Sequence, residues 1–342
     1  MGLVIDYSTG FFEATPTGEG VGTDPATIGD PSFGDVSLLL HGDGTSGSTT
    51  ITDSSSNSVS MTVTGNTQID TAIKKFGTGS IQFDGTGDYL TTPTNSTFGY
   101  GAGDFTIEFF LYLNNVSSSQ TICSNLTSAS STNPHIYLQS GGTIRYYTAS
   151  ASRITSAVLS TGQFYHVAVS KSGSSTKLFI NGSQSGSTYS DSNDYGASAP
   201  LGVGTYWNGG SPVSTSTLNG YIDELRITKG VARYTSNFTP PTAAFLDNGP
   251  TLDLSSGNVF SHAPSANVAY TFTNPPTSGT SYDFTLKVTP SATVSITWPS
   301  SVEWPSGTAP AAPASGETDV YTFFTTDGGS TYYGNQVGDA VS

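Results

Sequence analysis

Short runs in which apolar and polar residues alternate recur along the chain. They are enriched in β-branched and aromatic residues, and clusters of Gly, Asn, Ser and Pro separate them. No long stretch places apolar residues at helical spacing, so the pattern predicts an all-β protein. The clearest predicted strands are 80–83, 105–113, 135–139, 165–170, 177–180, 221–227, 282–288 and 320–325.

Turn-forming residues indicate how these strands are connected and where they end. Asn181 and Gly182 follow an apolar run, and this dipeptide tolerates the positive φ angles of a tight two-residue turn, which predicts a β-hairpin. Trp298-Pro299 and Trp304-Pro305 are expected to mark strand ends or bulges, because proline cannot donate a hydrogen bond to a sheet.

Composition divides the chain into three parts. Residues 1–34 are rich in Gly, Pro and Thr, contain no basic residue, and are predicted to form an extended arm. A second boundary falls where clustered prolines and Asn-Gly-Pro interrupt the strand pattern. We therefore expect one β domain over 35–248 and a small, sandwich-like β domain over 249–342.

Charge and cysteine content exclude several classes of protein. The formal net charge of −15 disfavours binding to nucleic acid, and no apolar run is long enough to span a bilayer, so we expect no membrane insertion. The single cysteine, Cys123, cannot form an internal disulfide, and no Cys/His set has the spacing of a zinc site. The first residues lack the features of a secretory signal, which predicts synthesis without export by the general secretory route.

Two segments resemble ligand-binding loops. Gly42, Gly44 and Gly47 have the spacing of a dinucleotide fingerprint, but no helical pattern follows them, so a glycine-rich turn is predicted. The segment 191–202 begins like a helix-flanked calcium loop but lacks its final glutamate. A looser calcium site at Asp191 or Asp194 is the alternative to a polar turn there, and no other cofactor is expected.

Aromatic residues flanked by Gly, Ser and Asn are the candidate binding residues. A tyrosine or tryptophan ring can stack on the C–H face of a sugar while neighbouring amides bind its hydroxyls. The segment "GTYWNGG" is the best candidate because its glycines indicate a loop, where a Trp is harder to explain as core. We therefore predict ligand-binding residues Tyr206, Trp207 and Asn208, with Tyr195, Tyr146 and Tyr147 as secondary candidates, against the alternative of packing or a protein interface.

The segment "GYIDELRI" carries adjacent acids that could suggest catalysis. Regular strand alternation places Asp223 with Leu225 on one face and Glu224 with Arg226 on the other. The two acids therefore cannot act together on one glycosidic bond. We predict that donors from a neighbouring loop hold Asp223, that Glu224 pairs with Arg226, and that no residue is catalytic.

Two further predictions concern packing residues. His166, in "FYHVAVS", is expected to be a half-buried packing residue rather than a general base. Tyr234 and Phe238 are expected to pack before Pro240 and Pro241 close the first domain.

Five strings over residues 35–245 carry a family resemblance: "DVSLLLHGDG", "KKFGTGSIQFDGTGDYL", "GDFTIEFFLYL", "FYHVAVSKSGSSTKLFINGS" and "NGYIDELRITKGVARYTSNFTPPTAAF". In order and spacing they resemble the laminin-G-like, concanavalin A-like lectin/glucanase family. The resemblance implies an antiparallel jelly-roll sandwich of two sheets, with Phe110 at a core position that is often Trp. The glycanase branch uses Glu-x-Asp-x-x-Glu along one strand, which no segment matches, so the protein is expected not to be an enzyme.

The tail resembles a different group of proteins. Its "WPSGTAPA" and "FFTTDGGSTYYG" strings are similar to a small β domain at the ends of bacteriophage virion proteins, notably fibres and appendages. The resemblance implies a non-catalytic virion surface protein, a fibre or a decoration of head or tail, whose jelly roll binds polysaccharide on the host surface. The expected location is then the virion, outside the cell after lysis, following synthesis in the host cytoplasm.

This interpretation implies partners and leaves alternatives open. The arm would attach to other virion proteins, and fibre architecture favours a homo-oligomer, most simply a trimer. The main alternative is a purely structural virion protein whose lectin-like domain contacts only protein. The remaining alternatives are a glycan hydrolase and a bacterial adhesin. The sequence lacks the paired carboxylates that a hydrolase requires and the export signal that an adhesin requires.

Overall fold

The computed structural model describes residues 30, 32–128, 131–208, 210–247, 249–264, 267–291 and 293–341. Most of the predicted arm lies outside the described residues. The last residues of the predicted arm, 32–34, are described and belong to a compact unit, Ser32–Asp247. In this unit Phe33–Asp35 make a short 3-10 turn, η1, in which Phe33 is buried. A second compact unit includes the residues from 249 onward.

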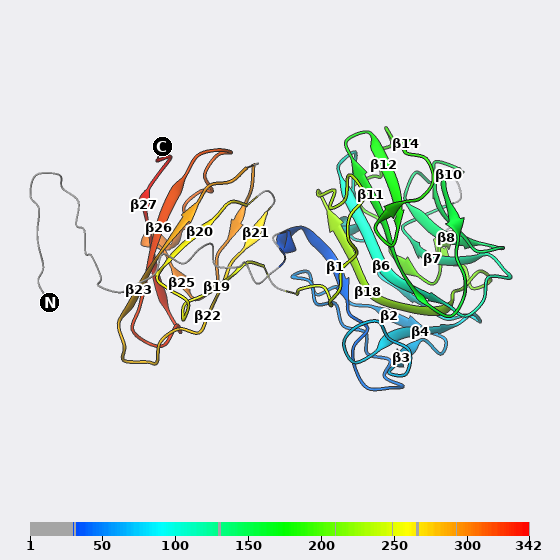
Figure 1. Cartoon of the computed structure of the whole chain (residues 1–342), viewed down its shortest axis with the longest axis horizontal. Coiled ribbons are helices and arrows are strands. Elements are labelled where there is room, and N and C mark those ends of the chain that lie inside the picture. The colour runs from blue at the N-terminus through cyan, green and yellow to red at the C-terminus, as the bar shows by residue number, and fades with distance from the viewer. Residues whose placement is uncertain are drawn as a thin grey trace, which may run out of the picture. The chain divides into compact units, whose positions relative to one another are not determined.

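The first unit contains a nine-stranded antiparallel sheet (Figure 1). Its strands, in spatial order, are β13 (Ser183–Gln184), β12 (Ser175–Ile180), β11 (Phe164–Ser172), β6 (Phe105–Leu113), β18 (Asn219–Lys229), β4 (Ser80–Asp84) and β3 (Gln68–Asp70), with β1 (Val36–Leu40) beside β18 and β14 (Tyr189–Ser190) beside β12. The centre of the sheet is therefore made by the long strands β11, β6 and β18.

A seven-stranded antiparallel sheet forms the other layer. Its order is β10 (Ala151–Val158), β9 (Thr143–Thr148), β8 (His135–Gln139), β7 (Gln120–Ser124), β15 (Gly202–Val203), β5 (Tyr89–Thr91) and β2 (Thr62–Thr64). The 3-10 turn η2 (Ser96–Phe98) and the small hairpin of β16 (Trp207–Asn208) and β17 (Ser211–Pro212) complete the unit. The main apolar core includes Ile107, Phe109, Ile136, Ile144 and Val203, which come from both sheets. The layers therefore pack face to face as a jelly-roll sandwich.

The second unit is also built of strands. Its five-stranded sheet has the order β20 (Val259–His262), β23 (Tyr282–Val288), β26 (Asp319–Thr325), β27 (Tyr332–Gly338) and β25 (Val302–Glu303), and two further pairs join β19 (Thr251–Asp253) to β22 (Thr271–Thr273) and β21 (Val268–Ala269) to β24 (Ile296–Thr297). A 3-10 turn, η3 (Pro305–Gly307), follows β25. This unit has its own aromatic core, including Tyr270, Phe284, Tyr321, Phe323 and Tyr332.

The strand and turn predictions are confirmed. Each of the eight predicted runs lies in an observed strand, and β12 and β13 form the predicted hairpin, with φ of 48° at Asn181 and 77° at Gly182. β24 ends just before Trp298, and β25 ends just before Trp304. The segment of Gly42, Gly44 and Gly47 is a loop without a following helix. No helix of the described residues is long and apolar enough to cross a membrane.

β18 departs from the regular alternation that the sequence suggested. Its pairing with β6 shifts register between Asp223 and Arg226, and Glu224 has a φ of 53°, so this part of the strand contains a β-bulge. Ile222 and Leu225 consequently both belong to the main core. The predicted grouping of Asp223 with Leu225 is therefore wrong, because the bulge reverses the facing of the residues that follow it.

Candidate functional site

A pocket lined by several aromatic rings lies on the seven-stranded sheet, over β7 and β8, and measures about 270 Å³. This is just below the usual range for small-molecule sites, roughly 300–1,000 Å³. Its lining combines aromatic rings with small polar side chains: Ser119, Gln120, Thr121, Leu126, His135, Tyr137, Tyr147, Tyr206 and Ser216. None of these described lining residues is an acid.

Strand alternation brings the aromatic rings of the pocket together. Along β8 and β9 the residues that face the core are Ile136 and Ile144 with their alternate neighbours, so His135, Tyr137 and Tyr147 face the other way. His135 lies directly opposite Tyr147 in the pairing of β8 with β9.

His135 lies between three tyrosine rings. Its ring stacks on Tyr137 at a centroid distance of 5.0 Å and meets Tyr147 and Tyr206 edge-on at 6.0 and 5.4 Å. Burial lowers the pKa of His135 to about 3, so the imidazole is neutral at physiological pH. Its buried Nδ1 atom has no hydrogen-bond partner among the described residues. The pocket therefore offers ring faces and edges around an uncharged imidazole.

Hydrogen bonds fix the polar rim. Nε2 of Gln120 donates to the carbonyl and side-chain oxygens of Asn115, and its Oε1 accepts from the backbone N–H of Asn219 at 2.8 Å. The Tyr137 hydroxyl lies 2.9 Å from Oγ of Ser152 on β10. These contacts hold the rim in one arrangement, which lowers the cost of ordering it around a ligand.

Tyr206 and Tyr147 are the predicted binding residues that line this pocket. Tyr206 belongs to a loop of fixed shape, because its carbonyl accepts from the N–H of Val213 at 2.9 Å and Thr205 Oγ1 donates to the Val213 carbonyl at 2.7 Å. The structure thus brings together two residues that lie far apart in the sequence.

Tyr146 and Tyr195 lie elsewhere, in the core between the sheets. Both are fully buried, and their hydroxyls lie 2.8 Å apart. The Tyr195 hydroxyl also donates to Asp191. The expectation that these two rings stack on a ligand is therefore corrected: the interior leaves neither ring face open to it.

Trp207 and Asn208 form β16 and are not among the lining residues of the pocket. Asn208 is exposed, whereas Trp207 is half-buried and its Nε1 atom is enclosed without a hydrogen-bond partner among the described residues. Tyr206 is therefore the residue of "GTYWNGG" that contributes to the pocket.

Sequence reasoning missed His135 and Tyr137, although it identified their strand. The available signal was the alternation in "HIYLQ", which places these two side chains on one face. That signal indicates a shared face but not that a pocket lies above it.

Asp191 and Asp194 were the candidates for a calcium site. Both oxygens of Asp191 accept hydrogen bonds, from Thr176 Oγ1 at 2.6 Å and from Tyr195 on one oxygen and from Asn193 on the other. Asp194 accepts from the N–H of Gly196. No group of three or more His, Cys, Asp or Glu residues placed to hold a metal ion occurs in the described ranges. The arrangement favours the polar turn.

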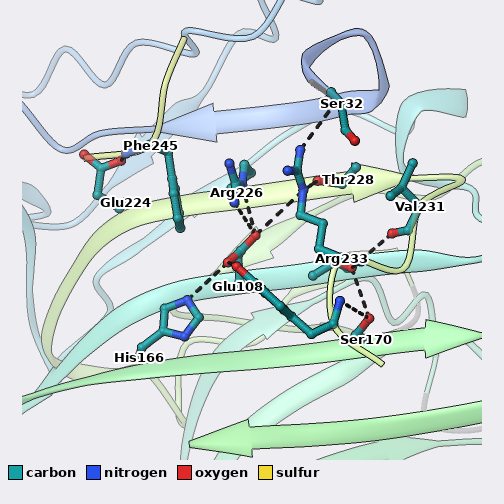
Figure 2. Close-up of polar contacts among 12 residues, drawn as sticks. Ser32, Glu108, His166, Ser170, Glu224, Arg226, Thr228, Val231, Arg233 and Phe245 are labelled. Carbon is teal, nitrogen blue, oxygen red and sulfur yellow. Dashed lines mark hydrogen bonds and ion pairs between the residues drawn. The ribbon is translucent and has the colours of Figure 1, made fainter. Parts of the chain in front are cut away.

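A buried cluster of charges lies on the nine-stranded sheet. Figure 2 shows Glu108 of β6 surrounded by side chains from β11, β18 and the segment after β18. Nε and a terminal nitrogen of Arg226 lie 2.9 and 2.8 Å from Oε1, while Nε2 of His166 lies 3.1 Å from Oε2. The Tyr234 hydroxyl donates to Oε2 at 2.8 Å, and Arg233 Nε lies 3.9 Å from Oε1.

This buried cluster holds neighbouring strands together through the charged carboxylate of Glu108. Burial alone raises the pKa of Glu108, but the charge of Arg226, the hydrogen bond and charge of His166 and the charge of Arg233 outweigh it and lower the pKa to about 2. His166 and Glu108 are both inaccessible to solvent. His166 packs as predicted but is fully buried rather than half-buried, and its polar partner, Glu108, is a residue that sequence reasoning did not find.

The two acids of "GYIDELRI" are also held internally. Oδ2 of Asp223 accepts from the backbone N–H groups of Lys75 and Phe76 at 2.5 and 3.1 Å, which confirms the predicted anchoring by a neighbouring loop. Glu224 accepts from Phe245 N–H at 2.8 Å and lies 2.9 Å from Nδ1 of His41. The predicted Glu224–Arg226 pair is wrong, because the bulge directs Arg226 to Glu108 instead.

The return segment after β18 packs as expected. The rings of Tyr234 and Phe238 stack at a centroid distance of 3.6 Å, and Phe238 also meets Phe179 and His166 edge-on. This segment therefore covers the charge cluster.

Comparison with known proteins agrees with the jelly-roll fold. Residues 84–233 match the model of the laminin-G-type family described as the concanavalin A-like lectin/glucanases superfamily. The first unit thus has the concanavalin A-like fold that the sequence predicted. No curated protein matches the chain.

Several solved structures are similar at low identity. Domain 4 of the extracellular arabinanase AbnA from Geobacillus stearothermophilus, in complex with arabinotriose, is 20% identical with a TM-score of 0.44, covering 58% of this chain and 94% of that one. The binding domain of botulinum neurotoxin serotype D is 13% identical (TM-score 0.43; 59% and 50% covered). A Trypanosoma rangeli sialidase in complex with sialic acid is 12% identical (TM-score 0.43; 58% and 31% covered). The chain thus spans half of the toxin domain and about a third of the sialidase.

Proposed function

We propose that the protein is a non-catalytic glycan-binding protein of a bacteriophage virion surface, and that the pocket on the seven-stranded sheet is its binding site. The observation that carries the glycan-binding part is the arrangement of His135 among Tyr137, Tyr147 and Tyr206. A sugar ring presents an apolar C–H face to an aromatic ring and hydroxyls to polar atoms, and this pocket supplies both kinds of contact.

The absence of acids from the described lining supports a binding role rather than hydrolysis. Glycoside hydrolases of the usual kind need two carboxyl groups on either side of the scissile bond. Asp223 and Glu224 lie on the other sheet and are engaged by backbone N–H groups and His41. Release of reducing sugar from a polysaccharide by the purified protein would contradict the non-catalytic proposal.

The virion part of the proposal rests on the resemblance of the tail to phage fibre and appendage domains. In this proposal the arm docks on other virion proteins, and the chain assembles as a homo-oligomer, most simply a trimer. It is synthesised in the host cytoplasm and reaches the exterior on lysis. Labelled antibody against the protein should decorate purified virions, and failure to label any part of the particle would overturn this part.

We expect Tyr206→Ala and Tyr147→Ala each to weaken binding to host polysaccharide about 10-fold, a loss of roughly 1.4 kcal/mol. Each variant removes a ring from the pocket lining without touching the main core. Binding measured by calorimetry on the full chain, beside the melting temperature, checks this expectation.

The matched control is Tyr333→Ala. Tyr333 is 52% exposed and lies in the second unit, so its removal should leave binding unchanged. If Tyr206→Ala and Tyr147→Ala bind the polysaccharide as tightly as Tyr333→Ala and the parent protein, the proposed site is wrong. Loss of particle assembly with unchanged glycan binding would instead favour the structural alternative, in which this surface contacts protein.

A further inference from the structure

Arg145 differs from other basic residues of the described chain in how it is bound. Lys171 donates to three backbone carbonyls, Lys177 and Lys229 each donate to one, and Arg226 pairs with Glu108. The Nε atom of Arg145, by contrast, is buried and has no hydrogen-bond partner among the described residues. A buried guanidinium nitrogen without a partner carries a desolvation cost that a bound acceptor would offset.

The position of Arg145 links it to the pocket. It lies on β9, directly opposite Tyr137 of β8, and two residues before Tyr147. Its neighbours Ile144 and Tyr146 face the core, so Arg145 shares the outer face of the sheet with Tyr137 and Tyr147 of the pocket. Residues directly opposite on neighbouring antiparallel strands have Cβ atoms only about 4.5–5.5 Å apart, well within the reach of an arginine side chain.

The electrostatics of the pocket make this cation important. The chain carries a net charge of −15, which repels anions in general. His135 adds no positive charge, because it is neutral above a pH of about 3. An acidic ligand would therefore depend on Arg145, whose planar guanidinium can bind a carboxylate through two parallel hydrogen bonds.

We propose that the pocket recognises a saccharide unit bearing a carboxylate, with the carboxylate bound by Arg145 and the sugar ring against the tyrosines. This inference rests on the proposed glycan-binding function and adds the chemical class of the ligand. It is carried by the position of Arg145, which is not itself a lining residue but shares the outer face of the sheet with Tyr137 and Tyr147, by its unpartnered Nε, and by a described lining that holds no charge of its own.

The test is a panel of neutral, carboxylated and sulfated oligosaccharides, followed by affinity measurements on a bound carboxylated member and its carboxyl-reduced form. We expect the bound members to be carboxylated, and reduction of the carboxyl to weaken binding about 10-fold or more. Arg145→Gln should bind both forms equally, at the level of the reduced form. Arg145→Lys, which keeps the charge but not the planar fork, should retain part of the preference.

Control variants separate the outcomes. Lys74→Gln removes an exposed charge that donates to the Thr71 carbonyl, outside the pocket, and should keep the full preference. Binding of neutral sugars without preference, or of sulfated sugars alone, would overturn the carboxylate inference and leave the glycan site standing. Binding to no member of the panel would overturn the proposed function as well.

Discussion

Glu108→Ala is expected to destabilise the first unit by about 3–5 kcal/mol, because it removes one partner of a buried ion pair and leaves the other uncompensated. Glu108 is fully buried, and its carboxylate accepts from Arg226 and Tyr234 and lies 3.1 Å from His166. Without it, the guanidinium of Arg226 remains largely enclosed, stacked 3.8 Å from the ring of Phe245. Such a loss is a large part of the total stability of a typical domain, roughly 5–15 kcal/mol.

Two further variants make this prediction sharper. Glu108→Gln keeps the volume and one acceptor and should lose less than Glu108→Ala, which separates the effect of charge from that of packing. Asp194→Asn removes an exposed charge from the same unit and should change stability by no more than about 0.5 kcal/mol. Denaturant unfolding of the three variants measures the differences. A Glu108→Ala protein within about 1 kcal/mol of the parent would show that the cluster does not anchor the sheet.

The cluster also predicts loss of stability in acid. The pKa of Glu108 in the folded protein, about 2, lies below its ordinary value of 4.5, so the unfolded chain takes up the proton first. The stabilisation is therefore complete above about pH 4.5 and is lost as the pH falls toward 2. Glu108→Gln should lack this part of the acid dependence.

Asp223 is expected to change the stability of the protein with pH in the direction opposite to that of Glu108. Burial, opposed by the hydrogen bonds from Lys75 and Phe76 and reinforced by the charges of Glu224 and Asp43, raises its pKa from 3.8 to about 7. The folded protein therefore binds this proton more tightly than the unfolded chain. Its contribution to stability is greatest below pH 3.8 and declines as the pH rises to about 7, by an amount of order 4 kcal/mol.

Asp223→Asn isolates this effect. The amide oxygen can still accept from the backbone N–H groups of Lys75 and Phe76, but the side chain stays neutral at every pH. The variant should be more stable than the parent at pH 8 and should lose the decline in stability between pH 4 and 7. Melting temperatures measured across this range check the prediction, and parallel curves for the two proteins would contradict it.

Asp223→Ala tests the anchoring itself. It leaves the partly buried N–H groups of Lys75 and Phe76 without this acceptor, at a cost of up to about 1–3 kcal/mol each, so the melting temperature should fall even at pH 5. Any loss of glycan binding should then follow from reduced stability. A stable Asp223→Ala protein that bound no glycan would assign a binding role to this residue.

The pocket shows why sequence reasoning identified only part of the site. Tyr146 and Tyr147 are adjacent on β9, so they must face opposite sides of the sheet, and at most one can reach a ligand. The alternation in "TIRYYT" groups Tyr146 with Ile144 and Tyr147 with Arg145, which indicates that Tyr146 faces the core. The sequence analysis considered the two tyrosines together and did not use this signal, and only the folded structure shows that a pocket lies over Tyr147.

The order of apolar and polar residues by itself determined the strands, the Asn181-Gly182 turn and the all-β class, because these depend on contacts between near neighbours in the chain. The tertiary structure decided what pairs with Glu108, where the bulge at Glu224 redirects Arg226, and how Tyr206 comes to meet His135. For Glu108 alone, these contacts join residues between 58 and 126 positions apart. They depend on which strands lie side by side, and no local pattern encodes that arrangement.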